Sequence, residues 1–588
     1  MGGEEKHVRE ALEQGEYLVA FEGARSAVLA GATGVVIRWL GVLALARAGS
    51  TERARRYFDD WSLGTGAEDR DPAIAEDLWA LDARIAKDGA VATDGVDRAG
   101  RCADAARRYE LIWDRMGRPY SGVNAATLWL LAGERARASE LAGLVRSVSA
   151  GSTPLSASDR YWQCATLAEC ALIEARVDDA SGYLGQADRC GLADLSARAS
   201  TRRQLLMICR HLELSPSLLD ELPVPGVVHY TGHMAAQAGG RFPADGSNEL
   251  QQRIGDSLAR RSVGFGYGSL GAGADIVVAE ELLARGADLH VFIPCQREAF
   301  VAASVAPAGP EWVARFERCL SAATSVTWLT DELDVTDPSL LAFNAHVAMG
   351  SARLQAGRLV TEPRQLAVWD GTPGDPAAGT GSEVHAWNDA GMATDVVDVP
   401  VKEPTSPAWS ATSERQVCSV LVGDFKGYSR LRDDQLAMFV EQFTSRIAAV
   451  IDRHGPMVLD RNTWGDGLIV FIDDPVTAAR CALELQQAVA AVDLEAHGLP
   501  VDLGLRVSLH AGPMIAMVDP VRRLPAFFGA QVVRAARIEP TTPEGEVYVT
   551  EAFAALLALA DPDGITCQYV GREATAKGYG IMALYLLR

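Results

Sequence analysis

Two short hydrophobic runs near the end of the chain each deliver one aspartate, and this pair is the strongest chemical signal in the sequence. The first run is Val-Leu-Val-Gly followed by Asp424, and Asp466 stands in Asn-Thr-Trp-Gly-Asp-Gly-Leu-Ile-Val-Phe. Both runs are rich in strand-forming residues, which predicts that the carboxylates sit at rigid strand ends. Because hard cations take oxygen ligands and keep room for phosphate oxygens, the pair indicates Mg²⁺ or Mn²⁺ bound together with a nucleoside triphosphate.

Three more motifs follow in order along the same region. They are Leu-His-Ala-Gly-Pro at 509–513, Phe-Gly-Ala-Gln-Val-Val-Arg-Ala-Ala-Arg-Ile-Glu at 528–539, and Ala-Lys-Gly-Tyr-Gly at 576–580. Either aspartate alone would be read as a residue that ends a strand or caps a turn. Together, the motifs resemble the class III nucleotidyl cyclase catalytic domain over about the last third of the chain.

The resemblance implies an α+β, ferredoxin-like domain and a reaction that forms a cyclic nucleotide and pyrophosphate. It assigns two divalent metal ions per active site to Asp424 and Asp466, stabilisation of charge on the α-phosphate to Arg537, and binding of the terminal phosphates to Lys577. It also implies a homodimer, because in this family the aspartates and the two basic residues come from different subunits. The residues that it assigns to substrate binding are Phe425, Gly427, Tyr428, Asn462, Gly465, Ala526 and Val533.

Three of these positions depart from the family pattern. Asn462 replaces a base-reading lysine, Ala526 replaces the Asp, Thr or Cys that accompanies it, and Val533 replaces an asparagine that orients the ribose. A base edge is recognised through hydrogen bonds, and the side chains of Ala526 and Val533 offer none, whereas Asn462 can donate and accept. The identity of the base therefore stays open.

Three functional interpretations remain. The first is an adenylate cyclase that reads adenine through other groups, which is the label most often given to similar bacterial proteins. The second is a pyrimidine cyclase that makes cyclic UMP or cyclic CMP, as in Pycsar antiphage systems. The third is a degenerate domain that senses nucleotides or dimerises without catalysis.

The charge and cysteine patterns set limits on partners and location. The formal net charge is −22, and this disfavours broad contact with nucleic acid or an anionic membrane surface. The ten cysteines form no Cys-x-x-Cys pair, which is typical of reduced thiols in a cytoplasmic protein. The apolar run 28–48 is interrupted by Arg38 and Arg47, so we expect a buried helix pair rather than a membrane span.

Residues 1–222 are predicted to be all-α. They are rich in Ala, Leu, Arg and Glu at helical spacing, with short polar breaks at irregular intervals. The pattern resembles a degenerate tetratricopeptide (TPR) array, and 120–128 with 161–169 resemble the helical TRAFs-binding region. We expect this part to scaffold a partner or receive a signal.

Residues 223–400 alternate short β-branched runs with helices, which predicts an α/β domain with a parallel sheet. Gly266, Gly268 and Gly271 fit G-x-G-x-x-G, and with Asp275 they form a second candidate ligand site at a helix N-terminus. The next strand ends in Pro-Cys-Gln at 294–296 rather than in an acidic residue, which excludes an NAD dehydrogenase. The arrangement resembles SLOG-type Rossmann-like sensor domains.

The two prolines in 401–413 predict a linker before the catalytic domain at 414–588. We expect a small molecule or a protein that binds the upstream domains to regulate the cyclase.

Overall fold

The computed structural model describes residues 3–13, 17–47, 50–66, 72–91, 97–191, 195–235, 241–243, 248–333, 337–373, 378–400, 415–501 and 503–588. The chain forms two compact units, Met1–Val224 with Tyr569–Arg572 and Pro225–Gln568 with Glu573–Arg588. The predicted linker at 401–413 lies outside the described residues. No helix in the described ranges is both long enough and apolar enough to cross a bilayer.

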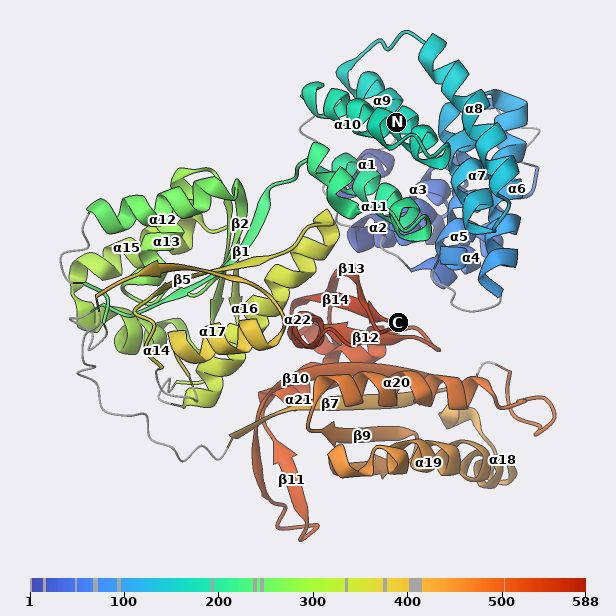
Figure 1. Ribbon diagram of the computed structural model, residues 1–588. Coiled ribbons are helices and arrows are strands. Elements are labelled where there is room, and N and C mark those ends of the chain that lie inside the picture. Colours follow the sequence, from blue (N-terminus) through green and yellow to red (C-terminus); the bar gives the residue numbers. More distant parts are fainter. Residues whose placement is uncertain are drawn as a thin grey trace. The chain divides into compact units, whose positions relative to one another are not determined.

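The first unit is helical, as the amphipathic spacing predicts. Helices that follow one another in the sequence pack side by side, so that each buries its apolar face on its neighbours (blue to green in Figure 1). Gly122 on α7 allows the closest approach, because a Cβ there would overlap Val145 and Trp113. The helices are α1 (Gly3–Glu13), α2 (Tyr17–Leu29), α3 (Val35–Arg47), α4 (Thr51–Asp60), α5 (Pro72–Val91), α6 (Asp97–Met116), α7 (Pro119–Leu131), α8 (Arg135–Gly151), α9 (Ala157–Ile173), α10 (Val177–Arg189) and α11 (Leu195–His211).

The second unit begins with the predicted parallel sheet, in the strand order β4-β3-β2-β1-β5-β6. All its pairings are parallel among the described strands, and helices cover both faces (Figure 1). The order reverses between β1 and β5, so the carboxyl ends of these strands form the crevice where open α/β sheets bind ligands. The elements are β1 (Gly226–Gly232), α12 (Asn248–Arg260), β2 (Val263–Gly268), α13 (Ala274–Ala284), β3 (Asp288–Ile293), α14 (Arg297–Phe300), α15 (Pro310–Ala322), β4 (Ser325–Trp328), α16 (Pro338–Leu359), β5 (Arg364–Trp369), α17 (Thr380–Asp389) and β6 (Thr394–Asp398).

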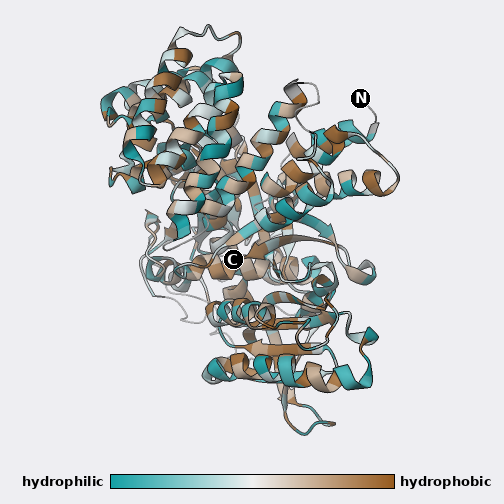
Figure 2. Cartoon of the chain, turned by 90° about the vertical axis from the view of Figure 1, so that its right-hand side faces the viewer, coloured by the Kyte–Doolittle hydropathy of each residue, from teal (hydrophilic) through white to brown (hydrophobic). Residues whose placement is uncertain are grey.

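The C-terminal domain is built on a second sheet of eight strands in the order β13-β14-β12-β10-β7-β9-β8, with β11 paired to β10. Hydrophobic residues (brown in Figure 2) dominate its central strands, which helices cover. Strand β10 pairs with β7, β11 and β12 and so connects the parts of the domain that carry the predicted site. The elements are β7 (Arg415–Lys426), α18 (Asp433–Phe439), α19 (Ser445–Arg453), β8 (Val458–Trp464), β9 (Gly467–Ile472), α20 (Pro475–Ala490), β10 (Gly504–Val518), β11 (Pro525–Phe528), α21 (Ala530–Ile538), β12 (Val547–Thr550), α22 (Glu551–Ala560), β13 (Cys567–Ala574) and β14 (Ile581–Leu587).

Helix α16 packs on the parallel sheet and also on α22 of the C-terminal domain. The helices approach so closely at Gly350 that a Cβ there would overlap the carbonyl of Ala555. Arg353 donates to the carbonyl of Leu559 (3.4 Å) and forms an ion pair with Asp561, at the end of α22. Helix α16 therefore packs on one side against the parallel sheet and on another against the C-terminal domain.

The α16–α22 contact should not tolerate even a methyl group at position 350. Gly350→Ala would force the helices apart or strain them, at a cost of about 1–3 kcal/mol. We expect a lower apparent Tm for this unit by differential scanning calorimetry. The matched control is Gly357→Ala on the same helix, where a Cβ meets nothing within 4 Å. There alanine should stabilise by about 0.5–1 kcal/mol, and equal effects of the two substitutions would contradict the close packing.

Two carboxyl groups, Asp275 and Glu383, are half-buried at the starts of the helices beside β1. Burial raises the pKa of Asp275 to about 8, with a further contribution from Glu383, and burial raises the pKa of Glu383 to about 7. The backbone N–H of Gly271 donates to Asp275 Oδ2 at 3.2 Å. His229 Nε2 lies 3.9 Å from Glu383 Oε2, but burial lowers the pKa of His229 to about 3, so that ring is neutral at physiological pH.

These acids make the second unit less stable as pH rises. In the unfolded chain they titrate near pH 4, so between about pH 4 and pH 8 the folded state binds more protons than the unfolded state. The stabilisation is complete below the unfolded pKa values and is lost as pH rises through the folded ones. We expect a higher apparent Tm at pH 5.5 than at pH 8, with a smaller difference in Asp275→Asn. The exposed Asp256→Asn on α12 is the control, and an unchanged slope in Asp275→Asn would place the titrating group elsewhere.

Candidate active site

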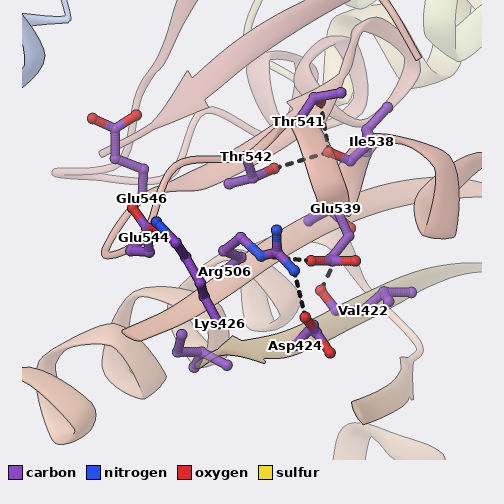
Figure 3. A network of polar contacts seen from close by, with 12 residues as sticks. Val422, Asp424, Lys426, Arg506, Ile538, Glu539, Thr541, Thr542, Glu544 and Glu546 are labelled. Atoms are coloured by element: carbon purple, nitrogen blue, oxygen red, sulfur yellow. Dashed lines mark hydrogen bonds and ion pairs between the residues drawn. The ribbon is translucent and has the colours of Figure 1, made fainter. Parts of the chain in front are cut away.

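Asp424 lies near the end of β7, directly opposite Arg506 on the antiparallel strand β10. The Arg506 guanidinium forms an ion pair with Asp424, and its Nε lies 2.9 Å from Glu539 Oε1 (Figure 3). Glu539 follows α21 directly, so one arginine joins the first predicted metal aspartate to the helix that carries Arg537. The Arg506 and Glu539 side chains are 21% and 10% exposed, so solvent screens this bridge less than an ion pair at the surface.

Asp466 occupies the turn between β8 and β9. Trp464 pairs with Gly467, which leaves Gly465 and Asp466 as the connection, and Gly465 has the positive φ of 70° that such a tight turn requires. A Cβ at Gly467 would overlap the Trp464 ring, so glycine is needed there as well. Burial raises the pKa of Asp466, and the neighbouring Asp424 carboxylate adds to the shift. The fold therefore brings the two predicted aspartates close enough to interact.

Negative charge exceeds positive charge at this place. Burial raises the pKa of Glu539 to about 7, Arg506 opposes the shift, and the two aspartates add to it. Among the described residues no group of three or more His, Cys, Asp and Glu side chains is arranged to hold a metal ion by itself. Two carboxylates in a site short of positive charge nevertheless suit hard divalent cations whose remaining ligands are substrate oxygens, backbone carbonyls and water. The residues thus fit the predicted metal ions.

Phe425 near the end of β7 turns its ring into the core, whereas the Tyr428 ring in the following loop lies beside the turn at Gly465. Phe425 is 3% exposed and packs edge-on against Phe439 and Phe443, so its ring belongs to the core. Gly427 has a φ of 91°, and Tyr428 packs on Phe439. A role for Phe425 in substrate binding is thereby restricted to its backbone groups.

Arg537 and Lys577 lie on different elements. Arg537 is half-buried near the end of α21, which begins after Gly529 (φ 143°). Lys577 is exposed with a left-handed φ of 58°, on a loop that Thr575 closes by donating to the carbonyl of Gly580 through its N–H (2.8 Å) and hydroxyl (2.9 Å). In the described part of the chain neither side chain contacts Asp424 or Asp466.

The three positions that depart from the family pattern lie on three different elements. Ala526 on β11 is 6% exposed, whereas Val533 on α21 is 38% exposed. Asn462 on β8 accepts a hydrogen bond from the N–H of Thr463 (3.0 Å), which leaves its amide NH₂ for another partner. Only Asn462 can therefore read a base edge through its side chain.

Sequence reasoning missed Arg506 and gave Glu539 no role. Arg506 stands three residues before the Leu-His-Ala-Gly-Pro motif, and Glu539 ends the motif of α21. Their positions could have pointed to them, because Arg506 lies just before one predicted motif and Glu539 is the last residue of another. Their pairing depends on the register of β7 against β10, which the sequence does not fix.

The glycines of the second candidate site are explained mainly by packing. A Cβ at Gly266 would overlap Leu282 of α13, and one at Gly268 would overlap the ring of Tyr230. At Gly271 the nearest group is the Asp275 carboxyl, which accepts from the Gly271 N–H. That carboxyl takes the position at the start of α13 where a phosphate would bind. The structure thus gives the glycines a role in packing, and a ligand here stays a prediction.

Two segments of the chain match known protein families. Residues 412–588 match the family described as adenylate and guanylate cyclase catalytic domain, and residues 16–129 match Tetratricopeptide Repeats-Sensor, TPR-S. The putative adenylate cyclase 3 of Rhizobium meliloti (strain 1021) is 31% identical over 145 residues, which are 24% of this chain and 23% of that protein. The chain thus spans about a quarter of this curated relative's length.

Similar solved structures cover about a third of the chain. The adenylyl cyclase CyaB from P. aeruginosa is 17% identical, with a TM-score of 0.27. The similarity covers 30% of this chain and 94% of the CyaB chain. The guanylate cyclase domain of RhGC from Catenaria anguillulae in complex with GTP is 18% identical, with a TM-score of 0.26. The similarity covers 30% of this chain and 98% of the RhGC domain.

The family match confirms the prediction of a cyclase domain at the C-terminal end, and the TPR-S match confirms TPR-type repeats in the helical region. The SLOG-type and TRAFs-binding resemblances stay predictions. The chain thus carries a nucleotidyl cyclase catalytic domain of the class III adenylate and guanylate cyclase family, with a TPR-S region preceding it in the sequence.

Proposed function

We propose that this protein converts a nucleoside triphosphate into a 3′,5′-cyclic nucleotide and pyrophosphate. The observation that carries the proposal is the pair Asp424 and Asp466, placed together by β7 and the β8–β9 turn within a segment that matches the cyclase catalytic family. Both aspartates, Arg537 and Lys577 are present, which favours an active enzyme over a degenerate nucleotide-binding module.

Asp424 and Asp466 would hold two Mg²⁺ or Mn²⁺ ions. When bound, these ions supply charge neutralisation for the triphosphate and a lower pKa for the ribose 3′-hydroxyl. Arg506 would orient the Asp424 carboxylate from the opposite strand. The same guanidinium also forms an ion pair with Glu539. The backbone of the loop at 425–428 lies next to Asp424 in sequence and would contact phosphate oxygens.

Arg537 would act on the substrate held by another copy of the chain. In this proposal its guanidinium stabilises charge that develops on the α-phosphate, and the Lys577 ammonium binds the terminal phosphates. Two observations support a homodimer: neither side chain contacts the aspartates within one chain in the described ranges, and the hairpin of β10 and β11 exposes Met517, Val518 and Leu524. Exposed apolar surface of this kind is typical of interaction sites.

The base remains to be identified, and the positions that read it favour two alternatives. Adenine could be bound through the Asn462 amide, which keeps donors available. Ala526 and Val533 offer no hydrogen bonds, so a pyrimidine cyclase of the antiphage type is the second candidate. Either substrate would rely on shape and stacking more than on a lysine.

Product analysis tests the activity and the base together. We expect the purified full chain with Mn²⁺ and each of the four nucleoside triphosphates to give one cyclic nucleotide and pyrophosphate, identified by mass spectrometry. Cyclic AMP would support the first alternative, and cyclic UMP or CMP the second. Asp424→Asn should lower the rate about 100-fold or more and weaken Mn²⁺ binding measured by calorimetry.

The matched control is Asp434→Asn, an exposed carboxylate on α18 that pairs with Arg432. It should leave both the rate and Mn²⁺ binding unchanged. Absence of any cyclic product from the wild-type chain would indicate the degenerate module instead.

Mixing two inactive variants tests whether the active site is shared between subunits. Asp424→Asn and Arg537→Ala should each be inactive alone. If subunits exchange freely, half of the dimers are mixed and one of their two sites is intact, so activity should recover to about a quarter of the wild-type value. The control mixes Asp424→Asn with Asp466→Asn, whose lesions fall in the same half-site and should show no recovery. Activity of the first mixture at background level, with dimers present by light scattering, would contradict the shared site.

A further inference from the structure

The segment that follows β4 ties the parallel-sheet domain to the C-terminal domain. We call residues 329–333 with Asp337 the coupling segment; residues 334–336 lie outside the described ranges. The segment starts at the carboxyl end of the sheet, where Leu329 N–H donates to the carbonyl of Ile293 (3.0 Å) and the Thr330 hydroxyl donates to that of Pro294 (2.6 Å). It is thus bound firmly to the end of β3.

The same segment contacts α21. The carbonyl oxygen of Leu329 accepts hydrogen bonds from Arg534 Nη1 (2.8 Å) and Gln531 Nε2 (3.3 Å), and Leu329 is buried. The Oε1 of Gln531 lies 2.7 Å from Nε2 of His510 on β10, whose Nδ1 lies 2.7 Å from the hydroxyl of Thr550. Buried hydrogen-bonded chains of this kind hold one arrangement and resist small displacements.

A second contact reaches β7. Arg415, the first residue of β7, forms ion pairs with Glu332 (2.7 Å) and Asp337 (3.4 Å) of the coupling segment. The Asp337 side chain is 8% exposed and also accepts from the N–H of Ser339 at the start of α16 (2.9 Å). The segment therefore contacts both the strand that carries Asp424 and the helix that carries Arg537.

We propose that the coupling segment positions α21 and β7, so that a conformational change at the carboxyl end of the parallel sheet controls the cyclase. Arg537 lies one helical turn beyond Arg534, which means that a shift of the Leu329 carbonyl moves the helix that presents the catalytic arginine. The carboxyl edge is where open α/β sheets bind ligands. Control of catalysis rests on the proposed function, whereas control of the position of α21 does not.

Hydrogen–deuterium exchange on the full-length chain separates control of the position of α21 from control of catalysis. In Arg534→Ala we expect the amides of α21 to exchange about threefold faster or more, since the helix loses its buried anchor. Glu332→Gln changes an exposed side chain and preserves the fold, and it should speed exchange at the start of β7. If the chain is an active cyclase, Arg534→Ala should lower kcat more than it raises KM, because α21 would present Arg537 less well in the transition state.

The matched control is Arg353→Ala, which removes a different polar contact between the two domains, from α16 to the end of α22. It should speed exchange in α22 and leave α21 at the wild-type rate. Equal acceleration of α21 in Arg353→Ala and Arg534→Ala would reduce the segment to general domain packing and overturn the proposal. Wild-type exchange of α21 in Arg534→Ala together with wild-type exchange of β7 in Glu332→Gln would also overturn it. These exchange measurements test the role of the coupling segment whether or not the chain makes a cyclic nucleotide.

Discussion

The structure of the proposed active site depends on the antiparallel register between β7 and β10. This register sets Arg506 opposite Asp424, and from there the guanidinium reaches Glu539 after α21. A shift by one residue would turn Arg506 to the other face of the sheet and leave the aspartates without a cation. Strand β10 also carries His510, which holds Gln531 of α21. One strand thus relates the metal-binding side chains to the helix of Arg537.

Charge balance at the site explains why cations belong there. Asp424, Asp466 and Glu539 meet one arginine, and the pKa of Glu539 rises to about 7 because the site is buried and negatively charged. The whole chain carries a net charge of −22, so no general positive field attracts a triphosphate. In the proposed function, attraction comes locally from the metal ions and from Arg537 and Lys577. We therefore interpret the site as one that is completed by its substrate, its metal ions and a second subunit.

Some features were predictable from the sequence because they depend on local chemistry. The spacing of apolar residues predicted the helical region and the parallel sheet, and the motifs around Asp424, Asp466 and Arg537 identified the catalytic domain. Long-range pairing was not predictable. The bridge from Arg506 to Glu539 requires the sheet register, and the approach of α16 to α22 at Gly350 requires the packing of two domains. The close packing of Leu282 and Tyr230 against the glycines at 266 and 268 was likewise not readable from the motif, and a ligand at that loop stays a prediction.

The coupling segment gives the parallel-sheet domain a route to the chemistry that does not require large motions. Hydrogen bonds to charged donors weaken steeply with distance and angle, so a small displacement of the Leu329 carbonyl would cost Arg534 its partner.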